Sequence, residues 1–222
     1  FMQQVKWWGV RPYLGRVNLY LGPTTNALLY PIIRDWFTTS DNADAIAAFT
    51  AADYSETNGL TGNTTTKFLT PNAGSGINLS AITSVTNIHE AAYVRTGSDE
   101  SSVVMGLNDN NVFLSLDVSY AGTSYIELCA LNKYVTVADS AGVGFYFQTR
   151  SSNERKLWKN NINTLSSSDA TAGGALGSVA PLVHATSFLG AASLWTSRTL
   201  SYYAFGFGIP DNRAKAYYDA VQ

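Results

Sequence analysis

The chain has 222 residues and a mass of 23.9 kDa, a length that fits one large β domain better than two small domains. Charged residues make up 14% of the sequence, the formal net charge is −2, and basic residues form no cluster. This argues against nucleic-acid binding through phosphate neutralisation. Because no apolar run reaches about 18 residues, we expect no membrane insertion. The single cysteine, Cys129, cannot form an intrachain disulfide and is interpreted as a core residue.

Residues 1–58 combine several local patterns, and we expect them to form an irregular lead-in that packs on the main body. A short helix or strand is expected around Val17–Leu21. The segment Ser40–Phe49 begins with a residue suited to an N-cap and continues with apolar residues at helical spacing, which predicts a helix. The chain opens on Phe1, so we expect it to be a fragment or cleavage product of a longer polypeptide.

From residue 59 to about residue 207 the sequence is typical of successive strands. Apolar residues in 112–118 alternate with Phe113, Ser115 and Asp117, and 143–148 alternates in the same way. Further strands are expected at 67–70, 90–96, 102–107, 125–129, 155–159 and 181–189. Short strands separated by polar turns predict an antiparallel β-sandwich or barrel.

The C-terminal part of the sequence predicts a loop, a last strand and a final helix. Residues 166–177 are rich in Ser, Ala and Gly and are expected to form a surface loop without a site. Leu200–Phe207 has the composition of a buried strand, which Gly208–Pro210 ends. In Asp211–Val221 the apolar residues recur at helical spacing, so we expect a short helix docked on the sheet.

The sequence lacks the usual patterns of catalytic residues. None of the five glutamates has another carboxylate two or four residues away, as a glycosidase pair on one strand would require. Convergence of carboxylates from different strands is the less favoured alternative. His89 and His184 are interpreted as locally satisfied strand residues, since no Gly-x-Ser-x-Gly turn accompanies them. We therefore expect no enzyme, with a polysaccharide-degrading hydrolase or lyase as the alternative.

Two further features are interpreted as structural. Asn108–Asn111 offers oxygen ligands for calcium, but the strands on either side favour a hairpin turn. Trp158 is interpreted as a packed residue and not as a platform for a sugar. We accordingly expect neither a metal ion nor a cofactor.

One candidate ligand site follows if the strands between residues 89 and 129 form a meander. The turns at 97–101 and 119–124 would then lie at the same rim of the sheet. Acceptors beside an aromatic ring provide what a neutral sugar needs, namely hydrogen bonds to hydroxyl groups and an apolar face for stacking. The alternative is two polar turns with a tyrosine lid over the core. The candidate ligand-binding residues are Asp99, Glu100, Tyr120 and Tyr125.

Several segments occur in an order known from one family: Leu60–Leu69, Ala91–Thr96, Phe145–Ser152, Leu157–Asn161, and Tyr203–Gly208 leading into Ala214–Gln222. This order resembles the concanavalin A-like lectin/glucanase (laminin G-like) modules encoded by bacteriophages and bacteria. The resemblance covers about residues 59–222 and implies an antiparallel two-sheet jelly roll with a short C-terminal helix. The matching positions are structural, so no catalytic residue can be transferred.

The resemblance also implies a biological context. Such modules commonly form tail-fibre, head-fibre or tail-tip parts of virions, and some bind glycans. We therefore expect a non-catalytic, extracellular module on the virion surface that forms a homo-oligomer and contacts other virion proteins. Host-surface carbohydrate is its candidate ligand. A purely structural role in decorating the capsid or tail is the alternative.

Overall fold

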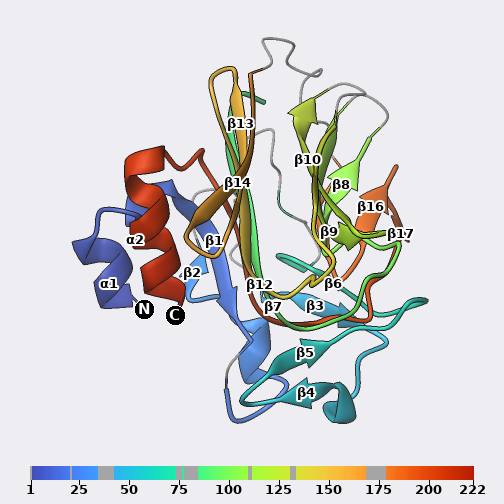
Figure 1. Cartoon of the computed structure of the whole chain (residues 1–222). Helices are drawn as coiled ribbons and strands as arrows, with labels where there is room; N and C mark the ends of the chain where they lie inside the picture. The colour runs from blue at the N-terminus through green and yellow to red at the C-terminus, as the bar shows by residue number, and fades with distance from the viewer. Residues whose placement is uncertain are drawn as a thin grey trace.

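The computed structural model describes residues 2–20, 22–34, 43–73, 77, 85–109, 112–130, 134–168 and 179–222. Within these ranges, two mostly antiparallel sheets stack face to face, as Figure 1 shows. The final helix, α2 (Asp211–Val221), follows the last strand. The predicted fold class, a mainly β sandwich with a C-terminal helix, is confirmed.

The first sheet contains strands from both ends of the chain. The last strand, β18, pairs with β7 on one side and with β1 on the other. The first 58 residues thus contribute paired strands to the main body. In spatial order the sheet comprises β14 (Ile162–Ser168), β13 (Glu154–Lys159), β12 (Gly144–Ser151), β7 (Asn87–Thr96), β18 (Thr199–Gly206), β1 (Leu14–Leu19) and β2 (Ile33–Arg34), with β4 (Tyr54–Ser55) and β5 (Gly59–Thr61) paired at the side.

The second sheet is built around three consecutive antiparallel strands, β8, β9 and β10. Strand β16 runs parallel to β8 and forms a hairpin with β17. In spatial order the sheet comprises β11 (Val135–Ala138), β10 (Thr123–Ala130), β9 (Phe113–Tyr120), β8 (Met105–Asn108), β15 (Leu182–Val183), β6 (Phe68–Thr70) and β3 (Ala45–Ala47), with β16 (Thr186–Phe188) and β17 (Ala191–Ser193) at the side.

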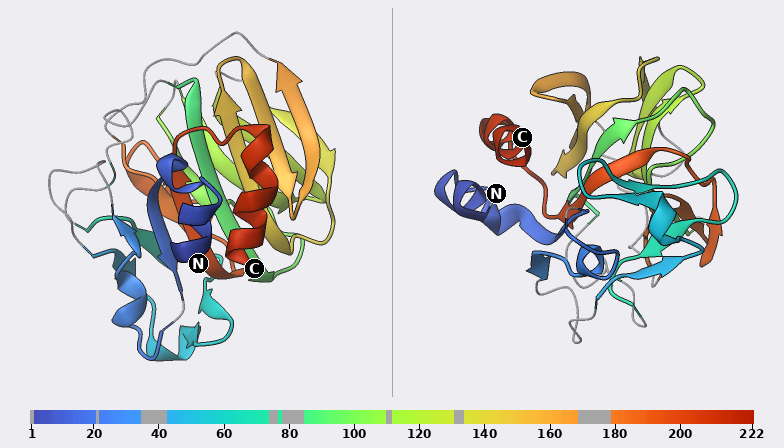
Figure 2. Two further views of the ribbon diagram at one scale, coloured as in Figure 1. Left: turned by 90° about the vertical axis from the view of Figure 1, so that its left-hand side faces the viewer. Right: turned by 90° about the horizontal axis from the view of Figure 1, so that it is seen from below.

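Two α-helices lie on the outer face of the first sheet. Helix α2 and the N-terminal α1 (Met2–Trp7) run side by side over this face, and the two chain ends lie next to each other (Figure 2). Tyr217 of α2 is fully buried and packs edge-on against Phe145, and its hydroxyl lies 2.7 Å from that of Tyr202. This face is therefore closed by aromatic packing. Within the described ranges, 3-10 turns occur at η1 (Arg11–Tyr13), η2 (Ala27–Leu29) and η3 (Ala51–Asp53).

The helix predicted at 40–49 is wrong for the part that the structure describes. Residues 45–47 form strand β3, which pairs with β6, whereas Ser40 lies outside the described residues. Tertiary contacts override the local pattern here, because the side chain of Asp44 points into the interior. There it accepts hydrogen bonds from Arg16 and Asn18, and it could not do so from a helix on the surface.

Most of the other predicted strands are present, with two differences. Strand β8 begins only at Met105, and the segment expected at 181–189 is divided into β15 and β16 by His184, which has a φ of 65°. Strand β14 extends to Ser168, so most of the loop expected at 166–177 lies outside the described residues.

The core lies between the sheets. The alternation predicted for 112–118 is confirmed, because Leu114, Leu116 and Val118 are fully buried in it while the intervening side chains point to the outer face of the second sheet. Cys129 is also buried, as expected, and burial raises the pKa of its thiol to about 12.

One ionic cluster joins the N-terminal strands to the end of the chain. Asp44, only 3% exposed, accepts hydrogen bonds from Arg16 (2.5 Å), Asn18 (2.7 Å), the Tyr203 hydroxyl (2.5 Å) and the backbone N–H of Asn72 (3.0 Å). Both carboxylate oxygens have several donors, so the buried charge is compensated.

Candidate functional site

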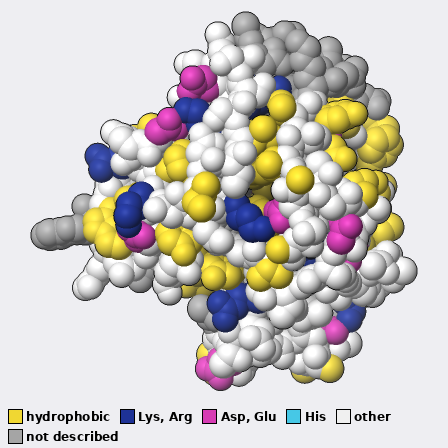
Figure 3. All heavy atoms as spheres, viewed as in Figure 1, with side chains coloured by type: hydrophobic (Ala, Val, Ile, Leu, Met, Phe, Trp, Pro, Cys, Tyr) yellow, Lys and Arg dark blue, Asp and Glu magenta, His cyan; other side chains and the backbone are white. Residues whose placement is uncertain are grey.

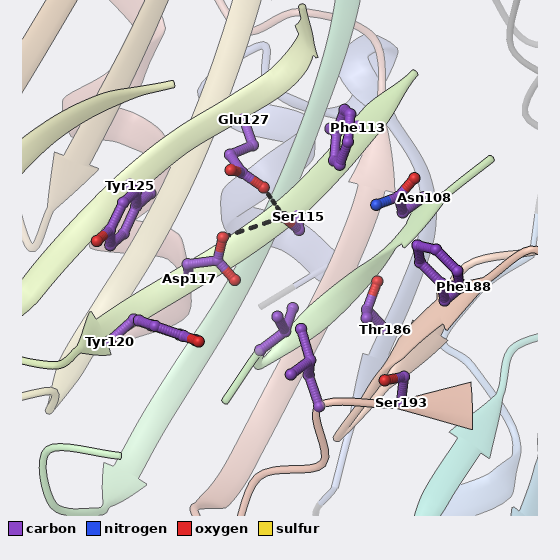
Figure 4. A pocket seen from close by; sticks show the side chains of 12 residues that line it. Asn108, Phe113, Ser115, Asp117, Tyr120, Tyr125, Glu127, Thr186, Phe188 and Ser193 are labelled. Carbon is purple, nitrogen blue, oxygen red and sulfur yellow. Dashed lines mark hydrogen bonds between the residues drawn. The ribbon is translucent and has the colours of Figure 1, made fainter. Parts of the chain in front are cut away.

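A pocket of about 270 Å³ opens on the outer face of the second sheet, over strands β8, β9 and β10 and beside the β16–β17 hairpin (Figure 4). No helix of the described chain covers this face. Figure 3 shows hydrophobic side chains gathered on the same side of the molecule, over β8, β16 and β17. The pocket is lined by Val103, Asn108, Phe113, Ser115, Asp117, Tyr120, Tyr125, Glu127, Thr186, Phe188, Ser193 and Leu194.

The polar centre of the pocket follows from the pairing of β9 with β10. In this register Asp117 lies opposite Tyr125, and Ser115 lies opposite Glu127. Side chains of directly opposed residues share one face of a sheet and come within contact distance. The leucines between these positions point into the core, so the acidic and hydroxyl groups all face outwards.

Asp117 and Glu127 meet at one hydroxyl group, and we call them the carboxyl pair. The Oγ atom of Ser115 lies 3.1 Å from Oδ2 of Asp117 and 2.6 Å from Oε2 of Glu127 (Figure 4). A hydroxyl has a single proton and can donate to only one of them at a time. Burial, reinforced by the negative charge of Glu127, raises the pKa of Asp117 well above its ordinary value. The pair therefore retains a proton under conditions in which an isolated aspartate would be ionised.

Two buried acceptors at this pocket have no hydrogen-bond partner within the described structure. They are Oδ1 of Asp117, a residue 6% exposed, and Oγ1 of Thr186, a residue 3% exposed. A buried polar atom without a partner costs about 1–3 kcal/mol of stability, and such atoms are rare in native proteins. A ligand that donates hydrogen bonds would satisfy them.

The structure divides the four predicted site residues into two groups. Tyr120 and Tyr125 both line the pocket, and their rings meet edge to face with centroids 5.9 Å apart. The ring of Tyr125 also packs against the exposed ring of Tyr134, with centroids 5.5 Å apart. These tyrosines give one wall of the pocket an aromatic surface next to the carboxyl pair.

Asp99 and Glu100 do not line the pocket. Oδ1 of Asp99 accepts hydrogen bonds from the backbone N–H of Gly122 (2.6 Å) and from Oγ of Ser119 (3.2 Å), so it fastens the turn between β9 and β10. The predicted meander is also wrong, because β7 belongs to the first sheet. The turns at 97–101 and 119–124 nevertheless meet at one rim, through these bonds of Asp99.

Glu100 is held by Arg198 and its neighbours. An oxygen of its carboxylate lies 3.1 Å from Nη1 of the buried Arg198, and the carboxylate accepts hydrogen bonds from Thr196 and Ser197. Burial alone would raise the pKa of Glu100, but the hydrogen bonds and the charge of Arg198 outweigh it and hold the pKa below its ordinary value. Glu100 is therefore part of a structural ion pair.

Ser115, Asp117 and Glu127 were missed as site residues from the sequence. A pair of carboxylates is expected from the sequence only at nearby positions of one strand, whereas Asp117 and Glu127 face each other across two strands. The less favoured alternative, convergence from different strands, is what the structure shows. The available signal was the alternation itself, which assigned Ser115 and Asp117 to the face opposite the core.

The two histidines differ in their hydrogen bonding. His89 is satisfied locally, as expected, with Nδ1 2.6 Å from the carbonyl oxygen of Phe207. For His184 the expectation is wrong: neither ring nitrogen has a hydrogen-bond partner within the described structure, and the ring stacks on Tyr20. Burial lowers the pKa of His89 to about 4 and that of His184 to about 3.

Trp158 and the turn between β8 and β9 are the two other features interpreted as structural. Trp158 stacks on Phe147 with parallel rings 5.7 Å apart, which confirms that it is packed. Strands β8 and β9 form the expected hairpin, in which Oδ1 of Asp109 accepts a hydrogen bond from Val112, while residues 110 and 111 lie outside the described ranges.

Among the described residues, no three His, Cys, Asp or Glu side chains gather closely enough to hold a metal ion. None of the helices described is both long and apolar enough to cross a membrane.

Comparison with known proteins shows similarity in structure alone. No protein-family model matches the sequence, and no curated protein sequence matches it significantly. The receptor-binding domain of botulinum neurotoxin C/D mosaic serotype is similar over 95% of this chain and 51% of its own, with a TM-score of 0.58 and 10% identity. The K499G mutant of NanB sialidase from Streptococcus pneumoniae is similar over 78% of this chain and 27% of its own, with a TM-score of 0.52 and 10% identity.

These likenesses establish a shared fold. The chain spans about half the length of the neurotoxin domain and about a quarter of the sialidase chain. At such low identity neither an activity nor a ligand can be transferred to this protein.

Proposed function

We propose that the protein is a non-catalytic glycan-binding module and that the pocket on the second sheet is its binding site. The observation that carries this proposal is the combination, in one pocket, of the tyrosine rings of Tyr120 and Tyr125 with the acceptors of the carboxyl pair. Sugar hydroxyls donate to such acceptors, and the apolar face of a sugar ring packs on an aromatic ring. A volume of about 270 Å³ suits one sugar unit better than a long chain.

A hydrolase that degrades polysaccharides is the second candidate, because the structure does bring two carboxyl groups together. In a glycosidase, however, the acid and the base or nucleophile flank the scissile bond, with a space of about 5 Å or more between them. Here both groups contact the same Ser115 hydroxyl. Release of reducing ends from a polysaccharide panel, abolished by Asp117→Asn, would establish the hydrolase and reject the non-catalytic proposal.

We also propose that the module lies on the surface of a virion, within a homo-oligomeric fibre or spike. The support is the sequence resemblance to phage-encoded jelly-roll modules, together with the low charge. Receptor binding and capsid or tail decoration remain the two alternatives. A contact map of the intact assembly separates them, because a decoration subunit touches several neighbours whereas a receptor-binding module is attached at one end.

Glycan binding is tested with an array of surface polysaccharides, followed by titration calorimetry on the best ligand. Tyr120→Ala should lower the affinity at least about tenfold, since a buried aromatic contact contributes about 1–3 kcal/mol. Tyr30→Ala is the matched control, because Tyr30 is 59% exposed and does not line the pocket. Unchanged binding by both Tyr120→Ala and Tyr125→Ala would exclude this pocket as the site.

A further inference from the structure

We propose that the pocket prefers glycans that carry a protonated primary amine, as in a non-acetylated amino sugar, and that the ligand's ammonium group takes the place of the proton held by the carboxyl pair. This inference rests on the proposed function and specifies its ligand class.

The carboxyl pair has no cationic side chain among the residues that line the pocket in the described structure. Two carboxylates that contact one hydroxyl repel each other when both are ionised, and a nearby cation would relieve this repulsion. Among the described residues that line the pocket, none is Lys or Arg. Arg198 is directed elsewhere, since its guanidinium binds Glu100 and donates to the carbonyl oxygens of Ser98 and Ser119. A ligand is therefore the available source of a counter-ion.

Two buried acceptors of the pocket residues lack hydrogen-bond donors within the described structure. Oδ1 of Asp117 and Oγ1 of Thr186 belong to residues that line the pocket, and both atoms are buried without a hydrogen-bond partner within the described structure. An ammonium group carries three N–H donors and no acceptor, so it can serve several such oxygens at once. In Figure 4 the side chains of Asp117, Glu127 and Thr186 surround the middle of the pocket. A neutral hydroxyl brings one donor and leaves the shared proton in place.

The acidic lining of the pocket also disfavours some ligands. A sugar carboxylate or sulfate would face Asp117 and Glu127 without a basic partner and would be repelled. An ammonium group beside Tyr120 and Tyr125 gains a further attraction from the electron-rich faces of their rings. The geometry thus orders ligands as amino sugar, then neutral sugar, then anionic sugar.

Exchange of the proton for an ammonium group makes the affinity depend on pH. Around Asp117, the negative charge of Glu127 on β10 favours the proton, and Arg198 opposes it. Glu90 on β7 lies behind the sheet, and burial raises its pKa well above its ordinary value. The phenols of Tyr120 and Tyr125 complete the surroundings. If one proton leaves for each ligand bound, affinity for the amine rises by up to about tenfold per pH unit, while the amine itself stays charged.

The experiment is titration calorimetry of the full chain with three ligands: a glucosamine tetramer, the N-acetylated tetramer of the same length, and sialyllactose. Measurements at about pH 5 and about pH 6, where the amine is charged, in two buffers of different ionisation enthalpy, report proton release. We expect the glucosamine tetramer to bind at least about tenfold tighter than its acetylated counterpart at the higher pH, with release of a proton. Asp117→Asn should remove this preference, and Asp99→Asn should retain it as a matched change of charge outside the pocket.

The outcomes separate the two proposals. Equal or tighter binding of the acetylated tetramer rejects the amine preference and leaves glycan binding intact. Failure of all sugars, on the array and in solution, rejects both. Equal loss of the preference in Asp99→Asn and Asp117→Asn would assign it to the overall charge of the module and overturn the inference. The comparison of ligands on the unaltered protein does not depend on whether a variant folds.

Discussion

Asp44 and Asp117 are almost equally buried, at 3% and 6% exposure, but their surroundings differ completely. The carboxylate of Asp44 lies in the interior of the protein and accepts hydrogen bonds from Arg16, Asn18 and Tyr203. The carboxyl group of Asp117 lies in a pocket, shares the hydroxyl of Ser115 with Glu127, and leaves one oxygen without a partner. The first arrangement is complete within the protein, whereas the second would be completed by a ligand.

The difference shows that burial alone does not distinguish a structural carboxylate from a binding one. A structural carboxylate has hydrogen-bond donors for both of its oxygens and a fixed positive charge beside it, whereas a binding carboxylate lacks them. The following predictions test this contrast, beginning with the largest expected effect.

Asp44→Ala should lower the free energy of unfolding by about 3–5 kcal/mol, because it removes the buried carboxylate that accepts hydrogen bonds from Arg16, Asn18 and Tyr203. Urea denaturation at neutral pH measures the change. Asp99→Ala, which removes a carboxylate at an exposed turn, is the control. A loss below about 1 kcal/mol would contradict the structural role given to Asp44.

The histidines should make the fold sensitive to acid. Both have pKa values lowered by burial, to about 4 for His89 and about 3 for His184. Below about pH 6.5 the unfolded chain therefore binds protons that the folded chain excludes, and each histidine removes up to about 1.4 kcal/mol of stability per pH unit. Between pH 6.5 and 5 this amounts to about 2 kcal/mol per histidine. Unfolding free energies of the wild type and His184→Gln at several pH values should differ in slope, and equal slopes would contradict the prediction.

Asp117→Asn should behave in the opposite way to Asp44→Ala. The pKa of Asp117 is raised in the folded state, so the group lowers stability as the pH rises above its unfolded value near 4. Replacing it with a neutral amide should raise the unfolding free energy by about 1–2 kcal/mol at pH 7 and have little effect at pH 4. Destabilisation at pH 7 would show that the carboxyl pair is structural.

The smallest effect on ligand affinity is expected at Asp99. Loss of its bonds to Gly122 and Ser119 should cost about 1–2 kcal/mol of stability and weaken glycan affinity only a few-fold, by loosening the turn that carries Tyr120. Calorimetry on Asp99→Ala and Tyr120→Ala compares the two. If Asp99→Ala loses as much affinity as Tyr120→Ala without loss of stability, Asp99 contacts the ligand directly.

The fold could be predicted further than the site because strand alternation is a local property of sequence. The alternation in 112–118 was sufficient to assign both faces of β9. The site could not be predicted in the same way. The meeting of Asp117 with Glu127 depends on the register between β9 and β10, and the position of Tyr120 depends on an irregularity at the turn. Asp117 and Tyr120 are three residues apart and would lie on opposite faces of a regular strand. Ser119, with a φ of 50°, and the register shift between Thr123 and Tyr125 bring both to the pocket.

The position of the chain ends has a practical consequence for all of these measurements. Both ends lie beside α1 and α2, on the outer face of the first sheet, and the pocket opens on the outer face of the second (Figures 1 and 2). A biotin tag or a fluorescent protein fused to either terminus would therefore project away from the pocket. The same molecule could be anchored to a biosensor, or displayed in many copies on a particle, with every pocket directed outwards.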